Sequence, residues 1–181
     1  MKSFIKHSFC VLIGIFGLTV LPAEAAQQVY LQIEGIEGES TDKAHVDWIE
    51  VLAWSWGMSN SNTTHTGTGG GAEVTSVQDL SVTKYIDKAT TALMLKAMNG
   101  AHIAEATLEV WEDCCETPYK MFAITMTNVL VTSVSTGGSN SESRFTENIT
   151  LNFAKLRVEY TPADQSGTSE MSWDIPTNRE Q

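Results

Sequence analysis

Apolar side chains recur at every second position in run after run of this chain, which is the spacing of a β-strand with one buried face. In residues 28–33, for example, Val29, Leu31 and Ile33 alternate with other residues. Similar runs occupy residues 45–58, 74–85, 103–111, 120–134, 145–160 and 171–175. This succession of strands, bounded by turn residues, predicts a mainly β fold, a two-sheet β-barrel or β-sandwich.

Two of these runs are longer than a simple strand and make specific predictions. Strict alternation across residues 45–58 predicts one face with Val46, Trp48, Leu52, Trp54 and Trp56. The opposite face is predicted to carry Ile49, Val51, Ala53 and Ser55, shading from apolar to small residues. In residues 145–160 the apolar phase ends at Phe153 and restarts at Leu156, which predicts a β-bulge near Ala154.

A single helix is predicted over residues 88–100, which are rich in Ala, Leu, Met and Lys. Thr90 is the expected N-cap, and the Asn99-Gly100 pair is the expected stop. Leu93 and Ala97, like Met94 and Met98, are four residues apart. Both pairs are therefore expected to share a helix face and to pack in the core.

The first 25 residues have the form of a secretory signal peptide. Lys2 and Lys6 precede a 13-residue apolar run, residues 9–21, and an Ala-Glu-Ala site follows. As a helix that run would measure about 20 Å, against about 30 Å for the bilayer core, which argues against a membrane anchor. Cleavage is expected between Ala25 and Ala26, leaving one domain, residues 26–181, with a loose end from about residue 176. A misassigned start, with the chain beginning near Val29, is the alternative.

The charge balance limits the partners of the mature chain. Without Lys2, Lys6 and Glu24 it carries 9 basic and 21 acidic residues, a net charge of −12. Such a surface repels nucleic acid and anionic lipid. Later segments lack an apolar run long enough for a membrane span, so neither nucleic-acid binding nor stable membrane insertion is expected.

No sequence pattern points to catalysis, a cofactor or a metal site. Residues 67–72, GTGGGA, fit a dinucleotide fingerprint formally, but they lack the preceding strand and following helix that the fingerprint requires. A flexible linker is the better interpretation of this tract. His45, His65 and His102 have no metal-like spacing, and no nucleophile elbow occurs. The chain is therefore not expected to be an enzyme, and no bound cofactor or metal is expected.

Longer stretches of the chain resemble the Hcp family, the tube-forming proteins of bacterial type VI secretion. The stretches are residues 34–59, 77–100 and 129–160, and the resemblance extends over about residues 30–175. They contain the motifs GESxDKxH, LAWSWGM, QDLSxTKYIDK, SxSTGGS and TENxTLNFA. The resemblance implies a two-sheet barrel with one flanking helix, hexameric rings, and rings stacked into a sheathed tube tipped by a spike protein.

The resemblance also implies a functional surface. Small effector proteins are carried in the lumen of such rings, and Ser55 and Ser139 are expected to face or border that lumen. The glycine-rich tract is expected to be the loop by which rings meet their neighbours. The signal peptide departs from the family, whose tube is built in the cytoplasm. A second hypothesis is therefore an exported ring that acts as a periplasmic or extracellular binding protein outside the secretion machine.

Cys114 and Cys115 have no counterpart in the family pattern, and we predict that they are oxidised in the exported protein. A disulfide between adjacent residues strains the intervening peptide, so bonds between protomers or rings are favoured. Non-reducing gels should then show covalent multimers that dissolve with reductant. Monomer alone, with both thiols free by mass, would reject oxidation in either form.

Overall fold

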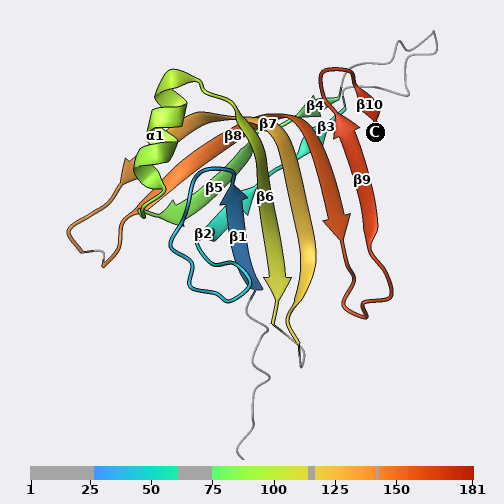
Figure 1. Ribbon diagram of the computed structural model, residues 1–181, viewed down its shortest axis with the longest axis horizontal. Coiled ribbons are helices and arrows are strands. Elements are labelled where there is room, and N and C mark those ends of the chain that lie inside the picture. The colour runs from blue at the N-terminus through green and yellow to red at the C-terminus, as the bar shows by residue number, and fades with distance from the viewer. Residues whose placement is uncertain (1–26, 61–74, 114–116, 142) are drawn as a thin grey trace, which may run out of the picture.

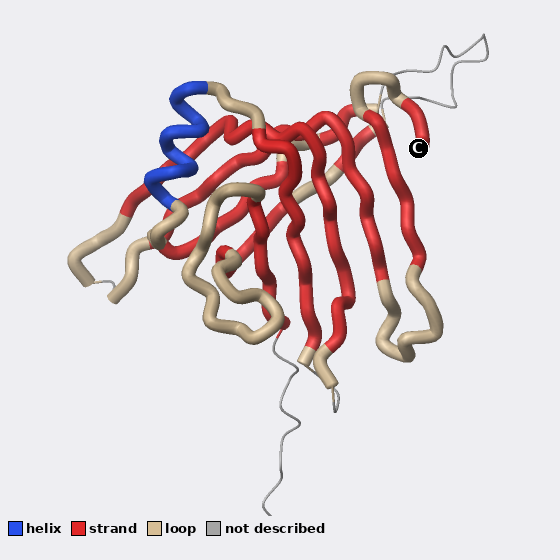
Figure 2. Tube along the Cα trace, viewed as in Figure 1, coloured by secondary structure: helices blue, strands red, loops and turns tan. Residues whose placement is uncertain are grey.

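The computed structural model describes residues 27–60, 75–113, 117–141 and 143–181, and its arrangement is shown in Figures 1 and 2. The elements in chain order are β1 (Gln27–Ile33), β2 (Ile49–Ser55), β3 (Met58–Ser59), β4 (Ser76–Val77), β5 (Leu80–Tyr85), α1 (Thr90–Asn99), β6 (Ile103–Glu112), β7 (Tyr119–Gly137), β8 (Thr146–Tyr160), β9 (Ser169–Asp174) and β10 (Arg179–Glu180).

Six antiparallel strands close into a barrel. Their order is β8-β5-β2-β1-β6-β7, and β7 pairs back onto β8, so the sheet meets itself. β9 and β10 extend the sheet beyond the barrel from β8, while β3 and β4 form a separate two-stranded ribbon. The expected barrel with one short helix is confirmed. Closure removes the exposed edges that an open sheet of these strands would present.

The longest strands, β7 and β8, each change face partway along. In β8 the buried positions run through Ile149, Leu151 and Phe153 and restart at Leu156, as the sequence predicts. β8 pairs with β5 before this point and with β9 after it. Its register with β7 is the same on both sides, because Asn128 of β7, at φ 58°, changes face there as well. The register of this strand pair shifts instead between Val131 and Ser133.

The predicted faces of the Trp-containing run are wrong in part. Ile49 and Val51 are buried in the core, yet Trp54 and Trp56 also pack against it. The register between β2 and β5 shifts between Val51 and Ala53, and Leu52 is exposed there. This bulge reverses the alternation, so that Ile49 and Val51 before it and Trp54 after it all face the core. Ser55 does lie opposite the tryptophans, as predicted.

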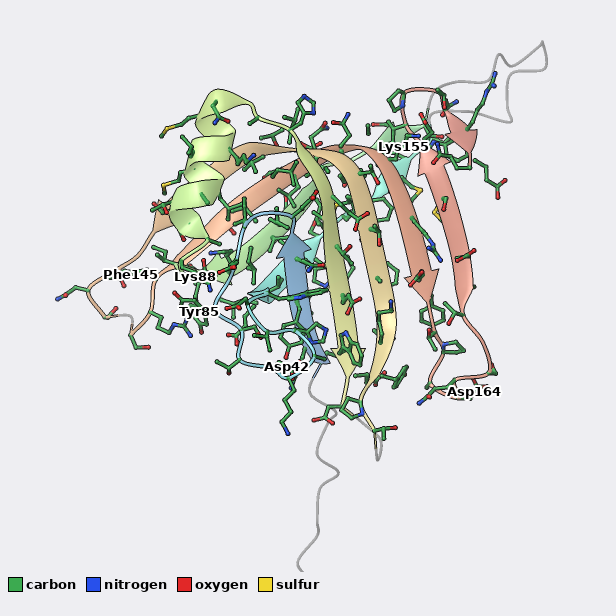
Figure 3. The ribbon with its side chains drawn as sticks, viewed as in Figure 1. Asp42, Tyr85, Lys88, Phe145, Lys155 and Asp164 are labelled. Atoms are coloured by element: carbon green, nitrogen blue, oxygen red, sulfur yellow. The ribbon has the colours of Figure 1, made fainter. Side chains whose placement is uncertain are left out.

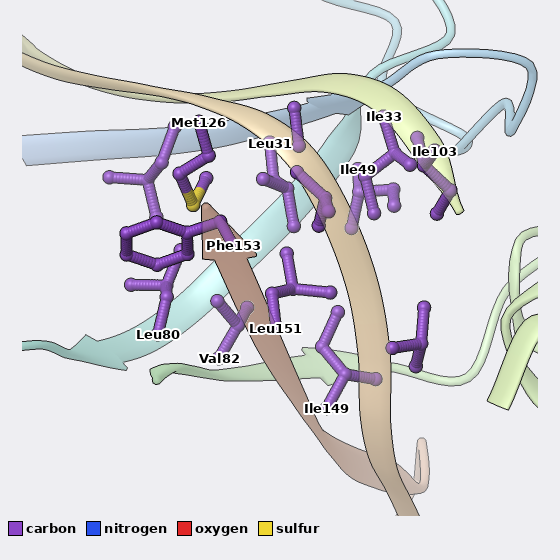
Figure 4. Packing of buried hydrophobic residues seen from close by; sticks show 14 of the residues in the cluster. Leu31, Ile33, Ile49, Leu80, Val82, Ile103, Met126, Ile149, Leu151 and Phe153 are labelled. Carbon is purple, nitrogen blue, oxygen red and sulfur yellow. The ribbon is translucent and has the colours of Figure 1, made fainter. Parts of the chain in front are cut away.

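The core fills the barrel with branched aliphatic side chains from every barrel strand (Figure 4). Leu31, Leu108, Ile124 and Leu151 are completely buried. Full burial of one such side chain contributes about 1.5–3 kcal/mol relative to exposure. Leu93 of α1 is buried in the same cluster, so the helix is held to the barrel by the core itself.

Helix α1 follows the predicted range but not the predicted contacts. Thr90 is its first residue rather than its cap, and the Asp87 carboxylate accepts the Ala89 N–H at 2.9 Å. Gly100 ends the helix at φ 62°, as expected of a left-handed C-terminal glycine. Met98 is 84% exposed, so the prediction that it packs in the core is wrong. Leu93 lies in the core, and Ala92 and Ala97 pack against it.

A buried ionic cluster joins β5, β8 and the start of α1. Lys84 has no exposed surface, and its Nζ donates to Glu147 Oε1 and to Asp87 Oδ1, both at 2.7 Å. The Thr90 hydroxyl donates to the same Glu147 oxygen at 2.8 Å. The cluster therefore pairs one ammonium with two carboxylates in the protein interior.

The C-terminal residues differ from the loose end expected from about residue 176. β10 pairs with β9, and the Thr177 N–H donates to the Asp174 carboxylate at 2.9 Å. The Gln181 side chain donates to the same carboxylate at 3.0 Å. Asp174 thus organises the turn that returns the chain to the sheet.

We predict that Lys84→Met lowers the free energy of unfolding by about 3–5 kcal/mol, because it leaves two carboxylates without their buried counter-charge. Lys88→Met is the matched control. Lys88 also contacts two carboxylates, those of Glu37 and Asp47, but it lies exposed at the surface. Urea unfolding followed by tryptophan fluorescence should show little change for the control. Equal losses in both variants would contradict the assigned role of the buried cluster.

Candidate binding and assembly surfaces

The barrel presents an outward surface of uncharged side chains along the end of β2, β5, the first half of β8 and the second half of β7, while Glu50 is exposed nearer the start of β2. This neutral face consists of Ser, Thr and Asn side chains, namely Ser55, Ser81, Thr83, Thr132, Ser133, Ser135, Asn148, Thr150 and Asn152. The Thr83 hydroxyl donates to Asn148 Oδ1 at 2.6 Å across the strands. Asp79 lies at one end, where its carboxylate accepts bonds from Thr132 and Asn152. The surface offers hydroxyl and amide groups to a ligand.

Ser55 lies on the neutral face, exposed and paired with Ser81 of β5. On the opposite side of its strand, Trp54 stacks on Phe122 with ring centroids 5.7 Å apart. The Trp54 ring packs toward the barrel, and the small Ser55 hydroxyl faces outward. This is the arrangement that the alternation around Ser55 predicts.

The structure does not bring Ser139 to Ser55. Ser139 is exposed beyond the end of β7, and its hydroxyl is 2.9 Å from that of Ser141. Ser133, which lies across β8 at the level of Ser55, is six residues back along the chain. That separation corresponds to about 20 Å in an extended strand. The two predicted residues can therefore border one surface but do not form one compact site.

A second outward surface, along β6, the first half of β7, the second half of β8 and β9, is charged. The charged face comprises Glu109, Lys120, Lys155, Arg157, Glu159, Glu170 and Asp174 (Lys155 is labelled in Figure 3). Arg157 donates to Glu159 at 2.8 Å and to Glu170 at 2.5 Å. Burial alone would lower the pKa of Lys120, but the carboxylates of Glu159 and Glu109 raise it above its usual value. These charges are mutually paired.

Apolar side chains lie exposed at opposite ends of the molecule's long axis, where Figure 1 places α1 and β9. On α1, Leu95 is 61% exposed, and Met98 lies one turn further along. At the other end, a cavity of about 150 Å³ is lined by Met58, Thr75, Val77, Leu156, Met171 and Trp173. Sequence reasoning missed Leu95 and Met98 as surface residues. Their position off the Leu93 stripe is the signal that would have found them.

Several residues singled out in the sequence lie outside the described ranges. These are the cleavage site at Ala25 and Ala26, the cysteines Cys114 and Cys115, and the glycine-rich tract within residues 61–74. Across the described ranges, no three His, Cys, Asp or Glu side chains are grouped so that they could hold a metal ion. Within the same ranges, no helix has the length and apolar character needed to cross a bilayer.

Within the described residues the protein is a closed β-barrel with one flanking helix, one neutral face and one charged face, an architecture suited to binding and assembly through those faces. The chain belongs to the Hcp family of the type VI secretion system, whose members are structural tube proteins: residues 30–160 match the family described as "Type VI secretion system effector, Hcp". The recognition made from the sequence motifs is thereby confirmed.

Individual relatives agree over nearly their whole length. "Protein hcp1" of Pseudomonas aeruginosa is 48% identical over 158 residues, which are 84% of this chain and 98% of the relative. The crystal structure of Hcp1 from Salmonella typhimurium superposes with a TM-score of 0.74 at 34% identity, over 86% of this chain and 99% of that one. A structure described as a type six secretion system protein gives a TM-score of 0.79 at 28% identity, over 86% of this chain and 100% of that one.

Proposed function

We propose that the chain forms a hexameric ring in which each protomer meets the next head to tail, and that the neutral faces line the central channel. A cyclic ring requires two different, complementary surfaces on opposite sides of each protomer. The exposed apolar residues of α1 and the apolar cavity beside β9 meet that requirement. Their position at opposite ends of the long axis is the observation that carries the proposal (Figure 1).

The chemistry of the neutral face suits a channel wall. Serine, threonine and asparagine offer hydrogen bonds without a fixed charge, so cargo of either sign can approach without strong attraction or repulsion. Ser55 and Ser139 are the proposed contacts for small effector proteins. The charged face would then lie outside the channel, where stacking, sheath and spike contacts are proposed. No enzymatic role is proposed for the chain.

We predict that wild-type protein at micromolar concentration has six times the protomer mass by light scattering and a ring shape by electron microscopy. Leu95→Glu combined with Met98→Glu should shift it to monomer, because two carboxylates would enter an apolar contact. Lys96→Glu, one residue along α1 and therefore about 100° around the helix axis from Leu95, is the matched control and should keep the ring. A monomeric wild type would contradict the ring, and a hexameric double variant would contradict this interface.

A substitution at Ser55 tests whether the neutral face lines the channel, separately from whether the ring forms. Ser55→Arg is expected to abolish retention of a co-purifying effector while the hexamer persists, because a long charged side chain would project from each protomer into the channel. Co-elution of effector and ring on a sizing column is the measurement. Loss of the ring in Ser55→Arg would make the position architectural, and full retention of effector would remove Ser55 from the contact surface.

The exported ring is the second candidate function, and the ordered features at the N-terminus of the sequence favour it. A cationic head, a 13-residue apolar run and an Ala-x-Ala site occur in the right order. We predict that the natural protein begins at Ala26 and lies outside the cytoplasm, where it acts as a periplasmic or extracellular ring. N-terminal sequencing decides the matter. A chain that begins near Val29 would instead favour a tube protein that stays in the cytoplasm until the secretion machine expels it.

A further inference from the structure

His45 is held between two carboxylates from different parts of the chain. It is 3% exposed, and it lies in the loop of residues 34–48, between β1 and β2. Its Nδ1 is 2.6 Å from Asp42 Oδ1, and its Nε2 is 3.1 Å from Glu109 Oε2 of β6. A neutral imidazole has one N–H and can donate to only one of these oxygens. Both contacts are therefore satisfied only when the ring carries both protons.

Three aromatic rings surround the same histidine. Tyr30 of β1 stacks on it, with centroids 4.1 Å apart and planes 5° from parallel. Trp48 and Trp111 meet it edge-on, at 4.9 Å and 5.1 Å. Aromatic faces attract a cationic ring, and a cavity of about 350 Å³, which His45 and Asp42 help to line, lies beside the site.

The loop around His45 is organised by the residues of the GESxDKxH motif. Asp42 Oδ1 also accepts the backbone N–H of Ala44, at 3.0 Å, and of His45, at 3.1 Å. The Gly38 N–H donates to the Asp47 carbonyl at 2.7 Å. A Cβ on Gly38 would lie 2.2 Å from the Trp48 carbonyl oxygen, so a side chain there would force the loop apart. His45 thus ties this closed loop to Glu109 of β6.

We propose that His45 is a pH-sensitive latch: its doubly protonated ring fastens the 38–48 loop to the barrel, and loss of one ring proton releases the loop. Deprotonation would leave a nitrogen lone pair of the buried His45 ring facing a carboxylate within hydrogen-bonding distance. Such a contact is repulsive and costly to bury. This inference does not depend on the ring or the channel.

Several other charged or titratable groups face the latch. From the barrel these are Tyr30 of β1, Glu109 and Glu112 of β6, the neighbouring Asp113, and Lys120 of β7; from the loop they are Asp42 and Lys43. Lys120 Nζ lies 3.5 Å from Glu109 Oε1, the second oxygen of that carboxylate. The hydrogen bond from His45 lowers the pKa of Asp42 below its ordinary value of 3.8.

Asp42 sets the acid limit of the latch. Because its pKa is lower in the folded protein, its contribution is complete above about pH 4 and is lost as the pH falls through the folded value. Rising pH opens the latch from the other side by removing a ring proton from His45. The loop is therefore fastened within a window that has both an acid and an alkaline limit.

Release of the loop would reach beyond its own residues. Lys88, which precedes α1, donates to Asp47 at 2.8 Å and to Glu37 at 3.1 Å, and its backbone N–H donates to Glu39 at 3.0 Å. Figure 3 shows Lys88 and Asp42 on the same side of the molecule. The exposed Val46 lies in the same loop. The latch thus controls the order of a surface that extends from β6 to the start of α1.

Hydrogen exchange followed by mass spectrometry tests the latch in the intact protein. Protection factors of peptides from residues 38–48, corrected for intrinsic exchange, should fall by about tenfold or more between about pH 5.5 and about pH 9.5. Peptides from the barrel core serve as the internal reference. In His45→Gln, which carries no titratable ring, loop protection should not change with pH. The matched control His102→Gln replaces an exposed histidine bonded to Asn128 and should behave as wild type.

The protonation state itself is read from the ¹⁵N chemical shifts of the His45 ring at the lower pH, and they should show two protonated nitrogens. A neutral tautomer there would overturn the proposal, and so would loop protection that is unchanged across the pH range in wild type. It would equally fail if His45→Gln kept the wild-type pH dependence. A variant whose loop is unprotected at both pH values would support it, since the loop then has no fastening at all.

Discussion

The ion pair between Lys84 and Glu147 lies where the barrel closes, and the rest of the fold depends on that closure. β8 pairs with β5 on one side and β7 on the other, so it is the strand that joins the two ends of the sheet. A slip of one residue in β8 would turn Glu147 outward and leave Lys84 buried without its partner. Because burying Lys84 without its partner would cost free energy, the ion pair fixes the register of β8 against β5. Asp87 accepts a hydrogen bond from Lys84, and Thr90 donates one to Glu147, so the same cluster also fixes where α1 begins.

Closure gives the molecule two unlike outward surfaces made partly from the same strands. β7 and β8 change face together at Asn128 and Ala154, where β8 exchanges β5 for β9 as its neighbour. Before this exchange β8 contributes asparagine and threonine to the neutral face, and after it β8 contributes Lys155 and Arg157 to the charged face. One change of phase thus allows a small barrel to carry uncharged polar side chains on one outward surface and paired charges on another.

The sequence predicts what depends on local periodicity and misses what depends on distant partners. Alternation located the strands and the change of phase at Ala154, and composition located α1. The bulge at Leu52 was missed because apolar residues on both sides of it fit two registers equally well. The sequence favours Thr90 as an N-cap because its hydroxyl could accept a backbone N–H, whereas in the structure that hydroxyl donates to the buried Glu147. His45 gave no signal because Glu109, which completes its site, is 64 residues away.

The central claim is that opposite ends of the closed barrel meet in a ring, and site-directed crosslinking tests it most directly. Cysteines are introduced at Met98 on α1 and at Met171 beside the apolar cavity, with Cys114 and Cys115 changed to serine. A short flexible thiol crosslinker should give a ladder of covalent species that ends at six protomers. Neither single-cysteine variant should form the ladder, since each end meets the other end rather than itself. A double variant that stays monomeric, or a single variant that forms dimers efficiently, would contradict head-to-tail assembly through these surfaces.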